Sequence, residues 1–458
     1  MNMEVKDSLL DLIGNTPMIK LKSLDTGLCD LYVKLELNNP GGSIKDRVGL
    51  SIIEEAEKSG ALLPGGTIIE ATAGNTGIGL ALIAALKGYK IILVIPDKMS
   101  REKILHLEGL GAEIILTRSD VAEGHPEYYQ DLARKLASET PGSFLANQFS
   151  NPSNPAAHRT TTAPEIWEQM QGQIDAVVAG VGSGGTLTGM AEYFKSQDPS
   201  ICMVAADPEG SIISDAVLKG EYSYDGGSWL VEGVGEDFIP DTFEVSLMDD
   251  AETVSDKEAF EVLRIILREE GILGGSSTGT LVAAAAKWCR KQTEHKNVVT
   301  FICDTGNKYL SKAFNNAWLH DNNLLETEKF GDLRDLINRR ADKGEMISVS
   351  PTDTLLVAYN RMRASDVSQI PVIESDNLMG LLDEEDLLFT VSKDPEAFSN
   401  NVSSHMIEKL DILQFGASEA ELLSILSEGK VAIIYDDETF IGFVTKVDLI
   451  NHYRNKVK

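Results

Sequence analysis

The pattern of hydrophobic and polar positions predicts an alternating α/β architecture for the first ~320 residues. The apolar runs are continuous rather than alternating, and they occupy residues 67–72, 90–96, 112–117, 175–182, 201–208 and 297–306. Strands that are buried on both faces of a parallel sheet have this pattern. Helical periodicity appears between them, at residues 76–88, 128–139 and 257–271. The alternation predicts open α/β sheets that bind ligands at the carboxyl ends of their strands.

The pattern changes near residue 326, where we place a domain boundary. The stretch LHDNNLLETEKFGD is polar and lacks strand periodicity, so residues 326–340 are interpreted as a linker. A chain of 458 residues has room for two or three domains. We therefore predict a first domain over residues 1–325 and two smaller domains over residues 341–395 and 396–458.

An internal repeat supports the two smaller domains. The segment IPVIESDNLMGLLDEEDLL matches AIIYDDETFIGFVTKVDLI, since each contains an apolar strand, an acidic turn, an apolar strand with a glycine, and a helix. Gly380 and Gly442 are separated by the same offset as Asp386 and Asp448. A matched offset indicates duplication. Two small α/β units that pack face to face are the expected product.

Composition and charge exclude several classes of partner. The chain has 43% hydrophobic and 24% charged residues, which is ordinary for a globular protein, and its net charge is −30. Nucleic acids and anionic membranes bind basic patches, so this charge argues against both as partners.

The cysteine pattern bears on metal binding and on compartment. The four cysteines show no CxxC spacing and no clustering with histidine, which argues against a structural zinc site and a disulfide framework. The histidines also lack a spacing typical of metal ligands. No signal-peptide pattern is found, and the apolar run GIGLALIAAL is too short for the roughly 20 residues of a membrane span. We expect a protein of the reducing cytoplasm.

The first candidate for chemistry is a lysine that follows a glycine turn. Residues 38–47 read NNPGGSIKDR and bring Lys45 to a predicted helix start. Such a lysine can hold a phosphate, or it can be a nucleophile that forms an imine with an aldehyde cofactor. The P-loop pattern GxxxxGK[ST] is absent, which weakens the first alternative.

A second glycine loop favours the aldehyde alternative. The segment GVGSGGTLTG follows an apolar run, and a helix that begins near Thr186 would direct its dipole at an anion. A phosphate cup combined with a distant reactive lysine fits pyridoxal phosphate, because the cup holds the phosphate and the lysine holds the aldehyde.

Two further turns place polar groups at the starts of helices. The segment EATAGNTGIGLAL brings Thr72, Asn75 and Thr76 to one turn, where a substrate carboxylate could bind. The segment GGSSTGT brings serine hydroxyls to another. A hydroxyl beside the pyridine nitrogen leaves that nitrogen largely unprotonated, which favours β-elimination over transamination.

Four motifs in order, NPGGSIKDR, ATAGNTG, GSGGTLTG and VEGVGEDFIP, closely resemble the β-family (fold type II) of pyridoxal-phosphate enzymes, with two open α/β subdomains of the tryptophan synthase β type. Within it the chain resembles the cystathionine β-synthase family, in which tandem CBS domains (a Bateman module) follow the catalytic domain. The resemblance implies pyridoxal 5′-phosphate bound by Lys45 as Schiff base, by Asn75 at the 3-oxygen, by the cup Gly182, Ser183, Gly184, Gly185 and Thr186, and by Ser277 (or Ser276) at the pyridine nitrogen. It places the substrate carboxylate on Thr72, Ala73, Asn75, Thr76 and Gln148, and a substrate ammonium near Glu232.

The resemblance also implies an activity. L-Serine and L-homocysteine would condense to L-cystathionine by β-replacement through an aminoacrylate, with Lys45 as the general base. Two departures favour O-acetylserine, since Ala73 replaces the usual serine and Phe149 the tyrosine of many such synthases, whereas Glu232 and the tandem module favour serine. Two alternatives to this activity remain. One is a cysteine synthase that uses O-acetylserine and sulfide, and the other is a non-catalytic nucleotide-sensing protein. The haem-binding extension of animal synthases has no counterpart before DLIGNTP, so we expect no haem.

The repeats carry a second candidate site. In the CBS-domain family a Gly-apolar-apolar-[Ser/Thr]-x-x-Asp segment offers its hydroxyl and its Asp to a ribose. GFVTKVD keeps this pattern with Thr445 and Asp448, whereas GLLDEED has Asp383 in the hydroxyl position beside Asp386. We hypothesise an adenosyl ligand, either S-adenosylmethionine or an adenine nucleotide. The alternative is a dimerisation module with empty clefts, and the resemblance suggests at least a homodimer.

Overall fold

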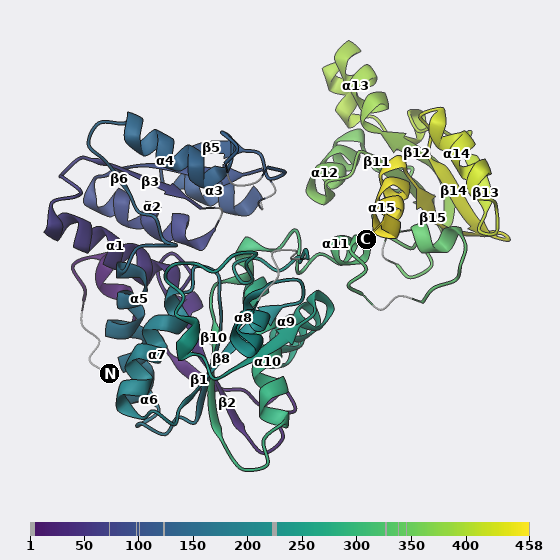
Figure 1. The fold of residues 1–458 in the computed structure, drawn as a ribbon. Coiled ribbons are helices and arrows are strands. Elements are labelled where there is room, and N and C mark those ends of the chain that lie inside the picture. The colour runs from purple at the N-terminus through teal and green to yellow at the C-terminus, as the bar shows by residue number, and fades with distance from the viewer. Residues whose placement is uncertain are drawn as a thin grey trace. The chain divides into compact units, whose positions relative to one another are not determined.

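The computed structural model describes residues 5–72, 74–97, 99, 101–121, 124–221, 227–325, 328–337, 339–344 and 346–457 (Figure 1). The chain forms two compact units, Met1–Asn315 and Asn316–Lys458. The first unit ends ahead of the predicted boundary at residue 325. Helix α11 (Asn316–Asp321) belongs to the second unit, where Nδ2 of Asn451 donates a hydrogen bond of 3.2 Å to Asp321.

The described part of the first unit contains two sheets of mainly parallel strands. The four-stranded sheet has the order β5-β4-β3-β6, and the six-stranded sheet has the order β1-β2-β10-β7-β8-β9. All neighbouring strands are parallel except β1 and β2. The strands are β1 (Met18–Lys20), β2 (Asp30–Leu35), β3 (Thr67–Ala71), β4 (Lys90–Pro96), β5 (Glu113–Thr117), β6 (Ser143–Leu145), β7 (Ala176–Gly180), β8 (Cys202–Pro208), β9 (Asp250–Val254) and β10 (Asn297–Ile302). This arrangement confirms the predicted α/β class.

Helices cover these sheets, as the ribbon shows (Figure 1). They are α1 (Lys45–Ser59), α2 (Asn75–Lys87), α3 (Arg101–Gly109), α4 (Tyr129–Glu139), α5 (Ser153–Ala157), α6 (Ala163–Gln169), α7 (Gly185–Gln197), α8 (Ile213–Lys219), α9 (Asp256–Glu270) and α10 (Ser276–Arg290). A π-helical turn, His158–Thr162, connects α5 to α6. A Cβ atom on Gly79 would lie 2.7 Å from the carbonyl oxygen of Lys45, so the close approach of α2 to the start of α1 requires a glycine.

The second unit shows the repeat in its strand register. Its elements are α12 (Leu355–Ser365), β11 (Gln369–Glu374), β12 (Asn377–Asp383), α13 (Glu384–Lys393), β13 (Asp411–Gln414), α14 (Glu419–Ser427), β14 (Ala432–Asp436), β15 (Thr439–Val444) and α15 (Lys446–Val457). Gly380 lies opposite Val372 and Gly442 opposite Ile434, and each pairing is followed by a register shift at the next residue. One apolar cluster contains Leu381 of the first repeat and Ile433 of the second, so the two repeats share a core.

The predicted linker contributes to that unit. Its short 3₁₀ helix, Leu333–Leu336, spaces apolar residues so that Leu333, Leu336 and Ile337 are buried in the core of the second repeat. The burial of this segment was not predicted, because a single apolar turn shows no repeating pattern in the sequence.

Among the residues described, no helix is both long and apolar enough to cross a membrane.

Candidate active site

Lys45 is the first residue of α1 and directly follows the glycine turn. Its Nζ atom donates a hydrogen bond of 3.1 Å to Oγ of Ser183, which belongs to the predicted phosphate cup. Burial lowers the pKa of the Lys45 amine to about 8, and the Cys303 thiol and Glu236 oppose this shift. More of this amine is neutral near pH 7 than for an exposed lysine, and only the neutral form acts as a nucleophile or base.

The cup residues 182–186 span the end of the turn between β7 and α7 and the first two residues of α7. Gly184 has a φ of +84°, a backbone conformation that favours glycine. A Cβ atom there would also lie 2.4 Å from Cβ of Phe243. Because α7 begins at Gly185, its first backbone N–H groups have no partner within the helix, and the positive end of the helix dipole lies at this turn. The turn is therefore suited to an anion.

The two hydroxyl groups of the cup have protein partners. Oγ of Ser183 accepts from Nδ2 of Asn154 at 2.9 Å as well as from Lys45. Oγ1 of Thr186 lies 3.2 Å from Nε2 of His158. With its acceptor positions filled, the Ser183 hydroxyl retains its hydrogen for donation to an anion.

Asn75 is the first residue of α2, and its amide is held at both ends. Nδ2 donates to Oδ2 of Asp304 at 2.8 Å, and Oδ1 accepts from Nζ of Lys308 at 2.9 Å. The hydroxyl of Tyr309 donates to the same Asp304 oxygen at 2.7 Å. Sequence analysis missed these partners. The available signal was that Asp304 follows β10, since open α/β sheets bind ligands at the carboxyl ends of strands.

The serine turn lies at the start of α10, and its two serines have different partners. Oγ of Ser276 accepts from the backbone N–H of Glu232 at 2.9 Å. Ser277 is buried, and its hydroxyl hydrogen-bonds to Cys303. Burial raises the pKa of that thiol to about 12, although the contact with Ser277 lowers it. Both serine hydroxyls therefore have protein partners, and the placement of Ser277 at the pyridine nitrogen stays a prediction.

The predicted carboxylate-binding residues surround the turn between β3 and α2. Oγ1 of Thr76 donates to Oε1 of Gln148 at 2.5 Å, and Oγ1 of Thr72 accepts from the N–H of Gly74 at 3.3 Å. Thr72, Thr76 and Gln148 are all buried. Ala73 lies outside the described residues. The structure thus brings the two predicted threonines and Gln148 into one region.

Glu70 of β3 holds the backbone segment that carries Gln148. It is buried, and the backbone N–H groups of Asn147 and Gln148 donate to it. Burial raises the pKa of Glu70 to about 8, although these N–H groups lower it. The carboxyl group is therefore largely protonated at pH 7 in the folded protein, and it positions the segment that carries Gln148.

We predict that Glu70→Gln changes how stability depends on pH. The unfolded chain releases the Glu70 proton near pH 4.5 and the folded chain near pH 8, so wild-type stability falls as pH rises between these values, by at most about 1.4 kcal/mol per unit. Glutamine does not titrate, so the advantage of Glu70→Gln over wild type should grow with pH from 5 to 8 in denaturant titrations. The exposed Glu113→Gln is the control and should show no such trend. A constant difference between wild type and Glu70→Gln would contradict the raised pKa.

Glu232 is paired with two lysines. Its carboxylate oxygens lie 2.6 Å from Nζ of Lys103 and 2.8 Å from Nζ of Lys312. Burial alone would raise the pKa of Glu232, but the two ammonium groups lower it. A carboxylate has further acceptor positions, and the Glu232 side chain is 14% exposed, so the placement of a substrate ammonium near Glu232 stays a prediction.

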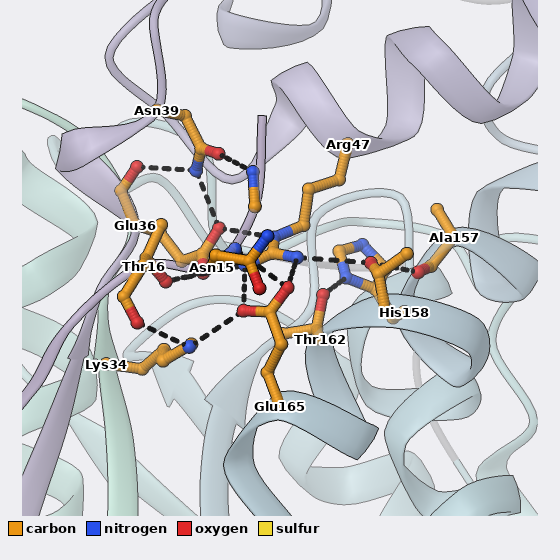
Figure 2. Close-up of polar contacts among 12 residues, drawn as sticks. Asn15, Thr16, Lys34, Glu36, Asn39, Arg47, Ala157, His158, Thr162 and Glu165 are labelled. Atoms are coloured by element: carbon orange, nitrogen blue, oxygen red, sulfur yellow. Dashed lines mark hydrogen bonds and ion pairs between the residues drawn. The ribbon is translucent and has the colours of Figure 1, made fainter. Parts of the chain in front are cut away.

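A buried network of charged side chains supports the start of α1 (Figure 2). The guanidinium of Arg47, two residues after Lys45, lies between Glu36 and Glu165, with N–O distances of 2.8 and 2.6 Å. Nζ of Lys34 lies 2.9 Å from a Glu165 oxygen. An isolated buried charge is costly, so each group depends on its partners. The network fixes the turn that carries Lys45.

The second unit contains a cavity of about 310 Å³. Its lining includes Thr445 and Asp448 of the second repeat and Asp366 of the first, and the Thr445 hydroxyl donates to Asp448 at 2.6 Å. Asp383 and Asp386 are not among its lining residues. Asp383 instead caps α13 by accepting from the N–H of Asp386 at 2.7 Å.

Comparisons with known proteins match segments in both units. The family described as "Pyridoxal-phosphate dependent enzyme" matches residues 9–304, and the CBS domain family matches residues 333–393. A cystathionine β-synthase of Dictyostelium discoideum is 36% identical over 98% of this chain and 92% of its own length. The chain belongs to the cystathionine β-synthase family. Its relative from Saccharomyces cerevisiae is 34% identical over 98% of both chains.

Two solved structures are similar to about two thirds of this chain. An O-acetylserine-dependent cystathionine β-synthase from Helicobacter pylori is 40% identical, with a TM-score of 0.62, over 68% of this chain and 99% of that one. A hydrogen sulfide-producing enzyme from Fusobacterium nucleatum is 39% identical, with a TM-score of 0.62, over 67% of this chain and all of that one.

The side chains of this cystathionine β-synthase family member fit pyridoxal phosphate. An amine whose pKa is lowered to about 8 contacts the glycine cup, which offers a helix N-terminus and a serine hydroxyl to a phosphate. Asp304, beside Asn75, has a buried Oδ1 atom without a hydrogen-bond partner among the described residues, so the site contains polar groups that its own side chains do not satisfy. Among the described residues, no group of three or more His, Cys, Asp or Glu could hold a metal ion.

Proposed function

We propose that this protein condenses L-serine with L-homocysteine to L-cystathionine by pyridoxal-phosphate-dependent β-replacement. The observation that carries the proposal is the 3.1 Å contact between the Lys45 amine and the glycine cup. The match to cystathionine β-synthases over almost the entire chain supports the substrate pair.

The roles of the residues follow from their surroundings. The bound cofactor supplies an electron sink that makes the α-proton of an amino acid acidic. Lys45 would hold the aldehyde, and its neutral amine would take and return the α-proton. The cup would hold the phosphate, and Asn75 and Ser277 would contact the 3-oxygen and the ring nitrogen. Thr72, Thr76 and Gln148 would hold the substrate carboxylate through buried hydroxyl and amide groups.

The test is a competition among substrates at matched concentrations. Serine with homocysteine should yield cystathionine as the main product, measured by mass spectrometry. The proposal would be abandoned if sulfide were strongly preferred over homocysteine.

A specific observation favours the alternative that O-acetylserine, rather than serine, is the preferred β-substrate. Phe149 packs on Phe238 with ring centroids 5.5 Å apart, so an aromatic ring without a hydroxyl lies next to Gln148. The similar structure from Helicobacter pylori is named as O-acetylserine dependent. If the activated substrate is used, O-acetylserine with homocysteine should exceed serine with homocysteine in kcat/KM, whereas equal or lower values would exclude this alternative.

We propose that the second unit, as tandem CBS domains, binds an adenosyl ligand that regulates the enzyme. The 310 Å³ cavity supports this, because it is lined by Thr445 and Asp448, whose hydroxyl and carboxylate can bind a ribose. Asp448→Ala would remove the carboxylate from this pair.

Calorimetry tests the regulatory proposal directly. S-Adenosylmethionine or ATP should release heat on binding to wild type, and the affinity should fall by at least about tenfold in Asp448→Ala, since a charged hydrogen bond contributes about 1.5–3 kcal/mol. Asp383→Ala, on the first motif, is the matched control and should bind like wild type. No heat and no thermal shift with either ligand would refute nucleotide sensing.

We also propose a homodimer or higher homo-oligomer in the cytoplasm. Exposed apolar side chains on α12 and α13, including Leu356, Leu388 and Phe389, support association.

All four cysteines are free thiols, which supports a reducing compartment.

A further inference from the structure

Two charged side chains fix the orientation of the Asn75 amide. Nζ of Lys308 lies 2.9 Å from Oδ1, and Oδ2 of Asp304 lies 2.8 Å from Nδ2. An ammonium group can only donate hydrogen bonds, and an ionised carboxylate can only accept them. A flipped amide would turn its NH₂ group toward the ammonium and its oxygen toward the carboxylate. Lys308 and Asp304 therefore permit one orientation of Asn75.

Both charged side chains are anchored in the walls of the site. Nζ of Lys308 also donates to the carbonyl oxygen of Gly41 at 3.0 Å, in the turn before the catalytic lysine. The Tyr309 hydroxyl donates to Oδ2 of Asp304 at 2.7 Å. Lys308 is 4% exposed and Asp304 is fully buried. Side chains held in this way cannot follow a rotation of the amide, so they act as fixed references for it.

We propose that Lys308 and Asp304 are positioning residues for the 3-oxygen of the cofactor and that they act through Asn75. Nδ2 carries two hydrogens, of which Asp304 accepts one. The side chain of Asn75 is only partly buried, so the 3-oxygen can approach Nδ2, where it would compete with the Tyr309 hydroxyl, which also hydrogen-bonds to the Asn75 side chain. The ammonium on Oδ1 polarises the amide and strengthens Nδ2 as a donor. The inference rests on the proposed placement of Asn75 beside the 3-oxygen.

The test compares two ligands of the apoprotein by absorbance titration. One is pyridoxal 5′-phosphate, and the other is 3-deoxypyridoxal 5′-phosphate, which lacks the 3-oxygen. Wild type should bind the natural cofactor about tenfold to a hundredfold more tightly, the range for a hydrogen bond to a charged group. Lys308→Met should lower this ratio by about tenfold, and Lys308→Arg should restore most of it.

Lys103→Met is the matched control. Lys103 is a second buried lysine in the same region, with Nζ 4.5 Å from the centre of the Tyr309 ring, and its hydrogen bond goes to Glu232. Its replacement should leave the ratio of the two affinities unchanged even if both affinities fall. This control distinguishes a nonspecific loss of cofactor affinity from a change in the orientation of the Asn75 amide.

The outcomes are distinct. A Lys308→Met protein that keeps the wild-type ratio overturns the inference. If that variant does not fold, Asp304→Asn decides, because an amide at position 304 can donate and accept and so removes one of the two constraints on the orientation of Asn75. Its ratio should fall severalfold, and an unchanged ratio overturns the inference. If wild type binds the two ligands equally well, Asn75 does not contact the 3-oxygen and the inference fails. The serine–homocysteine assay would be unaffected by that result.

Discussion

Lys45→Ala is expected to lower kcat for β-replacement by at least about 10³-fold, within the range for loss of a general acid–base group. The variant lacks the amine whose pKa is lowered to about 8 and which contacts the cup at 3.1 Å. Alanine is a good helix former, so α1 should begin as in wild type. The measurement is cystathionine formation under saturating serine and homocysteine, with cofactor added in excess.

Lys58→Ala is the control for this prediction. Lys58 lies in the last turn of the same helix, and its side chain is 80% exposed. Its replacement should change neither kcat nor the visible colour of the protein. A Lys45→Ala enzyme that keeps more than about a tenth of wild-type kcat would assign the proton transfer to another group, since general catalysis contributes at least about 10²-fold.

Arg47→Met is expected to reduce the free energy of unfolding of the first unit by about 3–5 kcal/mol, the range for removal of one partner from a buried ion pair. The guanidinium contacts two carboxylates in the network of Figure 2, and its loss leaves Glu36 buried without its cation. Although burial alone would raise it, Arg47 and Lys34 lower the pKa of Glu165 to about 2. Urea denaturation of wild type and variant measures the difference.

A surface arginine separates this effect from the general loss of a charge. Arg159 forms an ion pair of 2.7 Å with Glu192, but both side chains are partly exposed, at 50% and 36%. Exposed pairs contribute about 0–1 kcal/mol, so Arg159→Met should change stability by no more than that. Equal losses in the two variants would show that the buried network does not stabilise the start of α1.

The elements that sequence analysis predicted best are those whose pattern is local. The run 90–96 coincides with β4, and the helix predicted over 257–271 matches α9 to within one residue at each end. Buried parallel strands and amphipathic helices each carry their own periodicity. The edge strand β1 was not predicted, because it is short and mostly exposed.

In the candidate site, too, only the features with a local sequence pattern could be predicted. Glycine turns and helix starts are local, so Lys45 and the cup could be named from sequence. Their contact joins residues 138 positions apart, and no local pattern encodes it. The lysine partners of Glu232 and the charges around Asn75 likewise come from distant segments. Long-range pairing of this kind depends on how the sheets and helices pack, which residue patterns alone do not specify.

The most direct test of the central claim is to reduce the cofactor-loaded protein with borohydride and map the labelled peptide by mass spectrometry. The structure predicts a pyridoxyl phosphate group on the peptide that contains Lys45. A label on a different lysine, such as the buried Lys308, or the absence of any label in a yellow, active protein, would contradict it.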